Sequence, residues 1–231
     1  MVTSVHLADV APLTALRLLR TRLTDRDVPG LRYAQSLSAA PLSPHFLPAP
    51  RPGRAGLIAA WEDDAALDRF LASHPVAEAF AGGYLVRLAP IRIVGAWPEL
   101  GELPFAAAGN GSRPADAQDP ALPSGPAAVL TLGRLRLLRG AAFLRASARA
   151  ERDVLRSPGL QLATGLAHPP RIFATFSLWS DVSSMRDYVE QHDGGHRGAT
   201  SEHAANAFHS QSAFIRFRPY DESGSWHPPG S

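Results

Sequence analysis

The chain has 231 residues, 45% of them hydrophobic, which allows one large domain or two small ones with a real core. It contains no Cys, which excludes disulfides, thiol catalysis and thiolate-ligated haem or iron–sulfur centres. All 23 basic residues are Arg, which excludes lysine Schiff-base chemistry, and the net charge of +2 is too small to indicate nucleic-acid binding.

The sequence contains no recognisable membrane or targeting segment. No apolar run reaches the roughly 18 residues that a spanning helix needs. The N-terminal residues MVTSVHLADV lack the basic region and apolar core of a secretory signal. We therefore expect a soluble, cytoplasmic protein without a transmembrane segment.

The first hundred residues alternate between strand and helix patterns. Pro12 suits the first turn of a helix, and leucines then recur at helical spacing. Acidic residues 62–64 favour the start of a second helix, where the helix dipole stabilises them. Residues 40–54 contain five prolines and are predicted to be a loop. The predicted strands are 4–10, 31–37, 55–61 and 84–94, and the predicted helices are 12–25 and 63–73.

Residues 101–126 differ from the rest, because they are dense in Pro, Gly, Ala and Asp and almost lack bulky apolar residues. Such a stretch cannot bury enough surface to offset its ordering entropy, so we expect a flexible linker. The tail 221–231 is polar and is predicted to be disordered. Between them, strands are predicted at 128–137, 160–166, 172–179 and 212–218, and helices at 139–156 and 182–189.

Four anchors recur in the same order in both halves of the chain. Each half therefore has the order βαββαβ, which is typical of a ferredoxin-like unit. The fold class predicted is α+β, with tandem ferredoxin-like repeats at 1–100 and 127–220 that pair their sheets into a barrel with the helices outside. The anchors are Pro29-Gly30-Leu31 with Pro158-Gly159-Leu160, Trp61 with Trp179, Phe70 with Tyr188, and Arg87 with Arg216.

The second repeat contains an insertion within 191–211, since Arg216 follows Trp179 by 37 positions whereas Arg87 follows Trp61 by 26. Insertions on a duplicated scaffold are frequent sites of function. Imidazole is a common metal ligand and acid–base group, and without Cys any haem is expected to take an axial His. The spacing matches no standard zinc pattern, and loop histidines without a ligand role are the alternative for each residue. The histidines concerned are His192, His196, His203 and His209.

Arginines also gather in the second repeat. Arg145, Arg149 and Arg152 lie at helical spacing, and guanidinium is the usual partner of a carboxylate or propionate. The alternative is a solvated helix face, which we favour for Arg152. Trp61 and Trp179 stand at the ends of predicted strands, where core or rim aromatics are more common than catalytic ones.

The second half contains FLRASARAERDVLRSPGLQLATGLAHPP, then ATFSLWSDVSSMRDYV, a Gly-Gly-His step at 194–196, and FHSQSAFIRFRP. In these motifs it resembles the spheroidene monooxygenase family of carotenoid biosynthesis, over about 127–220, whereas the first half is only weakly similar. The resemblance implies a dimeric α/β-barrel fold, a link to haem b, and oxygen-dependent oxidation of an apolar substrate.

Carried over to this chain, the resemblance makes His196 the expected axial haem ligand and a catalytic residue, and Arg145 the expected propionate partner. His203, which the family pattern lacks, is a second catalytic candidate. Arg145, Arg149, Trp179 and Arg216 are the other candidate cofactor-binding residues. The expected partners are a hydrophobic substrate, O2 and an electron donor, with a homo-oligomer possible. Two alternatives stay open: a cofactor-independent monooxygenase in which His196 or His203 is a general base, and a non-catalytic protein that binds haem or an apolar ligand.

Overall fold

The computed structural model describes residues 1–42, 52–101, 125–139, 143, 147, 151–193 and 208–226, with side chains described up to residue 188 in the last helix. Residues 102–124 of the predicted linker lie outside this part. The division into domains therefore stays a prediction. Among the described residues, no helix is long and apolar enough to cross a membrane.

Both halves contain the predicted alternation of strands and helices. The described first half comprises β1 (Val2–Asp9), α1 (Pro12–Arg20), β2 (Leu31–Pro41), β3 (Arg54–Trp61), α2 (Asp64–Ser73), α3 (Pro75–Ala79), β4 (Tyr84–Gly95) and the 3-10 turn η1 (Pro98–Leu100). The described second half comprises β5 (Ala127–Leu135), the 3-10 turn η2 (Leu137–Arg139), β6 (Leu160–His168), β7 (Ile172–Trp179), α5 (Val182–Asp193) and β8 (His209–Ser223). Residues 151–154 are helical, as expected for the end of the helix predicted over 139–156.

Several elements differ from the sequence prediction; β2 and α5, for example, run on to Pro41 and Asp193. Helix α1 ends at Arg20 and not at residue 25, because the backbone turns extended at Thr21. Helix α3 was not predicted; it is too short for a periodic pattern, and the His74 side chain caps it by accepting from the amide of Val76. Strand β8 continues to Ser223, where it pairs with Leu85. Residues 221–223 are therefore sheet, and the prediction of disorder from residue 221 is wrong at this point.

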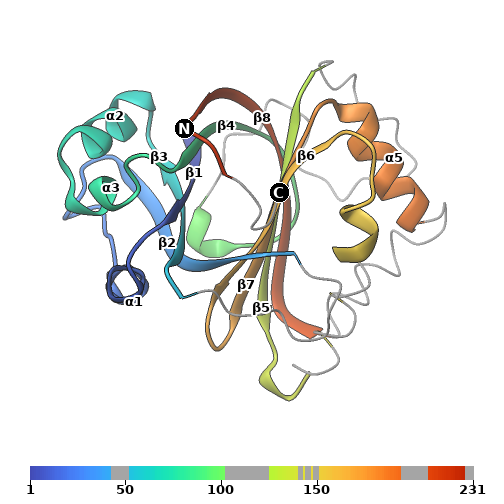
Figure 1. Ribbon diagram of the computed structural model, residues 1–231, viewed down its shortest axis with the longest axis horizontal. Helices are drawn as coiled ribbons and strands as arrows, with labels where there is room; N and C mark the ends of the chain where they lie inside the picture. The colour runs from blue at the N-terminus through green and yellow to red at the C-terminus, as the bar shows by residue number, and fades with distance from the viewer. Residues whose placement is uncertain are drawn as a thin grey trace.

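The strands form one closed antiparallel barrel in the order β1-β3-β2-β6-β7-β5-β8-β4. Each half has the same internal order of fourth, first, third and second strand. The β2–β6 and β4–β8 ladders join the halves. Figure 1 shows the barrel between two lobes, with α1, α2 and α3 on one side and α5 on the other. The predicted antiparallel barrel with outer helices is confirmed, whereas the tandem repeat in the sequence stays a prediction.

Two glycines at the predicted anchors adopt the same backbone conformation. Gly30 and Gly159 have φ of 87° and 77°, a region that favours glycine. The carbonyl of Gly30 accepts from the amide of Glu62 at 2.8 Å, and that of Gly159 accepts from the amide of Ser180 at 2.8 Å. Each glycine thus joins the start of one strand to the end of the next, beside Trp61 or Trp179.

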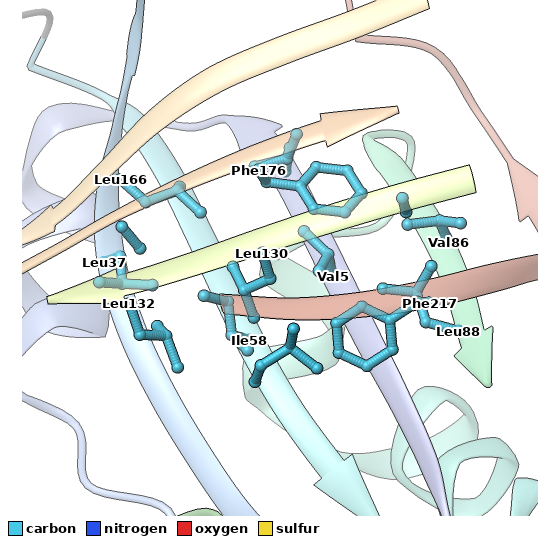
Figure 2. Packing of buried hydrophobic residues seen from close by; sticks show 14 of the residues in the cluster. Val5, Leu37, Ile58, Val86, Leu88, Leu130, Leu132, Leu166, Phe176 and Phe217 are labelled. Carbon is cyan, nitrogen blue, oxygen red and sulfur yellow. The ribbon is translucent and has the colours of Figure 1, made fainter. Parts of the chain in front are cut away.

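The inside of the barrel is a packed hydrophobic core. Large side chains from both halves point toward one another across the barrel, as Figure 2 shows. The interior of such a barrel can be filled by side chains or can hold a ligand, and the monooxygenase hypothesis assigned it the role of excluding water from the reaction. The structure instead fills it with side chains, so the interior is not a substrate chamber. Fully buried members include Val5, Ile58, Val86, Leu88, Leu130, Leu132, Phe176, Ile215 and Phe217.

The segment after β4 closes one end of the barrel. Trp97 and Leu100 flank and end η1, and both are 3% exposed and belong to the barrel core. The guanidinium of Arg134, on β5, lies over the Trp97 ring at 5.2 Å. Arg134 also pairs with Glu99 of η1. Strand β5 of the second half therefore holds the segment Trp97–Leu100, which follows β4 of the first half and forms a plug at one end of the barrel.

Candidate functional site

The outward faces of the two sheets can be compared position by position, because the ladders have the same register. Val2 opposes Trp61 in the first half, and Ala127 opposes Trp179 in the second. It follows that His6 and Leu57 correspond to Thr131 and Thr175. Any difference between these positions is a difference between the helix-covered faces of two similar sheets.

The first face is closed. His6, Leu57 and Ala59 are at most 1% exposed beneath α2 and α3. The Nε2 of His6 lies 2.9 Å from Ser4 Oγ, which also accepts from Trp61 Nε1 at 2.8 Å. Burial, and then the charge of Arg87, lower the pKa of His6 to about 3. This histidine is therefore a neutral core residue with a hydrogen bond.

The second face is more exposed than the first at the middle of β5 and β7, where two residues are smaller than their counterparts. Where the first face has buried Leu57, the second has exposed Thr175, and where the first has buried His6, the second has half-buried Thr131. Ala59 of the first half corresponds to half-buried Ser177 of the second. The residues form three rows across β7, β5 and β8: Ser177–Val129–Arg216, Thr175–Thr131–Phe214 and Phe173–Gly133–Ser212.

One end of this face is a small hydrophobic cluster beneath α5. Trp179 packs there with Val182 and Met185, and its ring lies 5.4 Å from that of Tyr188. Asp181 fixes the start of α5 by accepting from the amide of Ser184 at 2.7 Å. Hydrogen bonds from the Ser183 hydroxyl, and then from the Ser184 amide, hold the pKa of Asp181 well below its usual range.

The other end of the face is aromatic. Phe143 has ring contacts with Phe173 at 5.4 Å and with His209 at 5.1 Å. The His209 ring lies on Gly133, since a Cβ added there would stand 2.6 Å from both Nε2 and Cδ2. Real Cβ atoms are not found so close to other atoms, so only glycine fits beneath this imidazole. Its Nε2 edge faces the sheet.

The predicted site residues divide into described and undescribed ones. Trp179 is a buried core residue, and Arg216 is half-buried on β8 in the row of the open face nearest Trp179. The cofactor-binding roles predicted for these two residues stay predictions. Arg145, Arg149, His196 and His203 lie outside the described residues, so their catalytic, cofactor and metal roles stay predictions. In the described part, no group of three or more His, Cys, Asp or Glu could hold a metal ion.

Sequence reasoning missed the threonines and Gly133. A signal existed, because Thr131, Thr175 and Ser177 align with residues of the first half that are buried. Using it requires the strand register, which the sequence pattern alone did not supply. A separate hollow of about 460 Å³ lies beside η1, lined by Met1, Arg32, Glu62 and Glu99. It carries no imidazole and is rimmed by the exposed Arg32–Glu62 pair, so we assign it no role.

Comparison with known proteins supports the relationship predicted from the second half. No family model matches the chain. It is 29% identical over 229 residues to the spheroidene monooxygenase of Rubrivivax gelatinosus, covering 95% of this chain and 82% of that protein. It is 23% identical over 186 residues to the spheroidene monooxygenase of Cereibacter sphaeroides, covering 78% of this chain and 54% of that protein. The predicted resemblance is confirmed and extends into the first half.

Solved structures give weaker likenesses. A monooxygenase-related protein of Fusobacterium nucleatum has a TM-score of 0.38 and 8% identity, over 97% of this chain and 94% of that one. An anthrone oxidase-like protein has a TM-score of 0.34 and 12% identity, over 98% and 94%. A haem-degrading enzyme of Listeria monocytogenes has a TM-score of 0.31 and 10% identity, over 93% of this chain and 99% of that one. These scores are too low for the likenesses to carry an argument about this chain.

Proposed function

We propose that this chain is a monooxygenase-like enzyme that oxidises a hydrophobic small molecule on the outer face of its second sheet. The observation that carries the proposal is the contrast between the two faces. Buried Leu57 closes the first face, whereas exposed Thr175 leaves room at the same position of the second. The names of the two spheroidene monooxygenases support the reaction class.

The described side chains suit an apolar ligand with a polar group. Val129, Phe173 and Phe214 supply apolar contact, and Phe214 is 42% exposed although it is aromatic. Thr131 and Thr175 add hydroxyl groups that can donate or accept a hydrogen bond. Arg216 brings a positive charge to the same face, which suits a carboxylate of the ligand or cofactor.

Haem b is the cofactor that we propose. A haem would need an imidazole ligand and a cation for its propionates, whereas a bare metal ion needs several converging ligands. Arg216 would supply the cation, and the proposed imidazole, His196, lies outside the described residues. His196 remains our choice of ligand, on the Gly-Gly-His step at 194–196 that carries the resemblance. The described His209 suits this role less, because its Nε2 faces Gly133. Arg216 is the described candidate for a propionate partner. When bound, haem would activate O2, and the protein would orient the substrate.

The first experiment is an absorption spectrum of the protein expressed with a haem precursor, recorded before and after dithionite. We expect a Soret band at close to one haem per chain, and its loss in His196→Ala. Unchanged haem content in that variant would sink the ligand assignment. Absence of a band even after hemin is added would contradict haem dependence and favour the cofactor-independent reaction.

The location of the site is tested by closing the second face as the first is closed. Thr175→Leu introduces the residue found at the matching position, and we expect oxidation of an apolar substrate to fall at least about tenfold, because Leu occupies the ligand's space. Gln161→Leu is the control, since it adds the same side chain to an exposed residue of β6. Equal activity in the two variants would place the reaction elsewhere.

A further inference from the structure

The end of β5 presents an exposed leucine pair that no part of the proposed active site uses. Leu138 is 101% exposed and Leu137 is 51% exposed. They belong to η2, where the chain turns back after β5. An exposed large apolar pair at a projecting turn is a candidate contact for another surface.

Three arginines surround this pair. Arg136 and Arg139 flank the leucines, and Arg171 lies in the adjacent β6–β7 turn; all three are exposed. The turn is held against the end of β5, because the carbonyl of Arg171 accepts from the amide of Leu135 at 2.7 Å. Neither 134–139 nor 168–172 contains an acidic residue. We call residues 136–139 and 169–171 the β5 tip; Figure 1 shows the end of β5 and the β6–β7 turn at the same end of the barrel.

The geometry points to docking of the β5 tip onto an anionic lipid surface. Leucines that enter the interface and arginines that meet anionic headgroups are the combination by which peripheral proteins bind membranes. A second copy of the chain fits less well, because it would bring two clusters of arginine together.

The tip is also connected to the candidate site. The amide of Arg136 donates to the carbonyl of Phe208 at 2.9 Å, and its Nε donates to the carbonyl of His209 at 3.2 Å. His209 in turn lies on Gly133, next to Phe143. Lipid docking thus places the aromatic end of the face beside the bilayer, where an apolar substrate dissolves. The role of docking in substrate access rests on the proposed function, whereas the docking itself does not.

Flotation with vesicles tests the proposal. The full chain is mixed with vesicles of phosphatidylcholine and phosphatidylglycerol, or of phosphatidylcholine alone. We expect binding to the anionic vesicles that weakens as salt is raised, because salt screens the arginines. Leu137→Ser/Leu138→Ser should weaken binding by about tenfold or more, and Arg139→Gln/Arg171→Gln by about fivefold per arginine.

Leu13→Ser is the matched control, since Leu13 is 71% exposed on α1, on the other side of the barrel, with Arg17 and Arg20 on the same helix. Equal loss in the control and the tip variant, or no binding by the wild type, would overturn the proposal. So would a concentration-dependent dimer that the tip variant abolishes without any vesicle binding. Flotation needs no substrate, so failure here is distinct from absence of oxidation in detergent, which contradicts the proposed function instead.

Discussion

Replacing Gly133 by Ala tests whether the His209 imidazole is held on the outer face of the second sheet. Gly133 is in a regular strand and has no positive φ, so its backbone accepts Ala. In the interior of a strand, Ala is normally more stable than Gly by about 0.5–1 kcal/mol. The new Cβ, however, would lie 2.6 Å from His209 Nε2, so the ring has to move.

The structure supplies a matched control on β6, two strands away from β5 in the same barrel. At Gly165 a new Cβ meets only Ala40 O and Leu42 Cδ2, both at 3.6 Å, which is ordinary contact. Gly165→Ala should therefore show the intrinsic gain. Relative to it, Gly133→Ala should be less stable by about 1–3 kcal/mol, because overpacking forces the ring away from Phe143.

Equilibrium unfolding in urea measures the difference, and a double-mutant cycle assigns it. In a His209→Ala background the obstacle is gone, so Gly133→Ala should match Gly165→Ala. A coupling energy of about 1–3 kcal/mol between Gly133 and His209, equal to the gap that disappears, is expected. If Gly133→Ala and Gly165→Ala have the same stability, or if the gap persists without the imidazole, then His209 does not lie on Gly133.

Three further variants test the first half and the barrel plug. The pKa of His6 is lowered from 6.5 to about 3, so between these pH values only the unfolded state binds a proton on this residue. The free energy of unfolding should therefore decrease as the pH is lowered from 6.5 towards 3, by up to about 1.4 kcal/mol per pH unit. His6→Leu should flatten this dependence in unfolding curves. Arg87 lowers the pKa of Asp64, so this ion pair stabilises the fold at pH values above the usual carboxyl pKa, and the stabilisation is lost as the pH falls. Arg87→Met should lower the free energy of unfolding by about 1 kcal/mol at neutral pH, since Asp64 is half exposed. It should also weaken the decrease in melting temperature at acid pH. Trp97→Ala removes the buried plug and should cost about 3–5 kcal/mol in guanidinium unfolding; a cost below about 1 kcal/mol would mean that η1 does not close the barrel.

Local patterns predicted most of the elements because apolar periodicity reports which face is buried. The range 172–179, for example, is the strand observed as β7. Strand β8 was predicted too short because its end is stabilised by pairing with β4, more than a hundred residues earlier. Helix α3 depends on the cap at His74 and on packing, and not on a periodic sequence.

The candidate site was harder to predict than the fold. Thr131 and Thr175 are ordinary strand residues by composition, and their meaning appears only when the register shows that they correspond to His6 and Leu57 of the first half. His209 was grouped with other histidines as a possible ligand, whereas in space its ring is defined by the missing side chain of Gly133. Trp179 was predicted as a cofactor-binding candidate with a core position as the alternative, and its side chain is buried at the end of β7, as is common for a tryptophan at the end of a buried strand.

The closed barrel also affects how the protein behaves on dilution. The β2–β6 and β4–β8 ladders are made within one chain. The association of the two sheets is therefore intramolecular and does not depend on protein concentration, whereas an assembly of separate subunits dissociates on dilution. The covalent link also removes symmetry, since a homodimer must carry every substitution twice. Here Leu57 is buried in one face while Thr175 is exposed at the matching position of the other, the face on which we propose that the substrate binds.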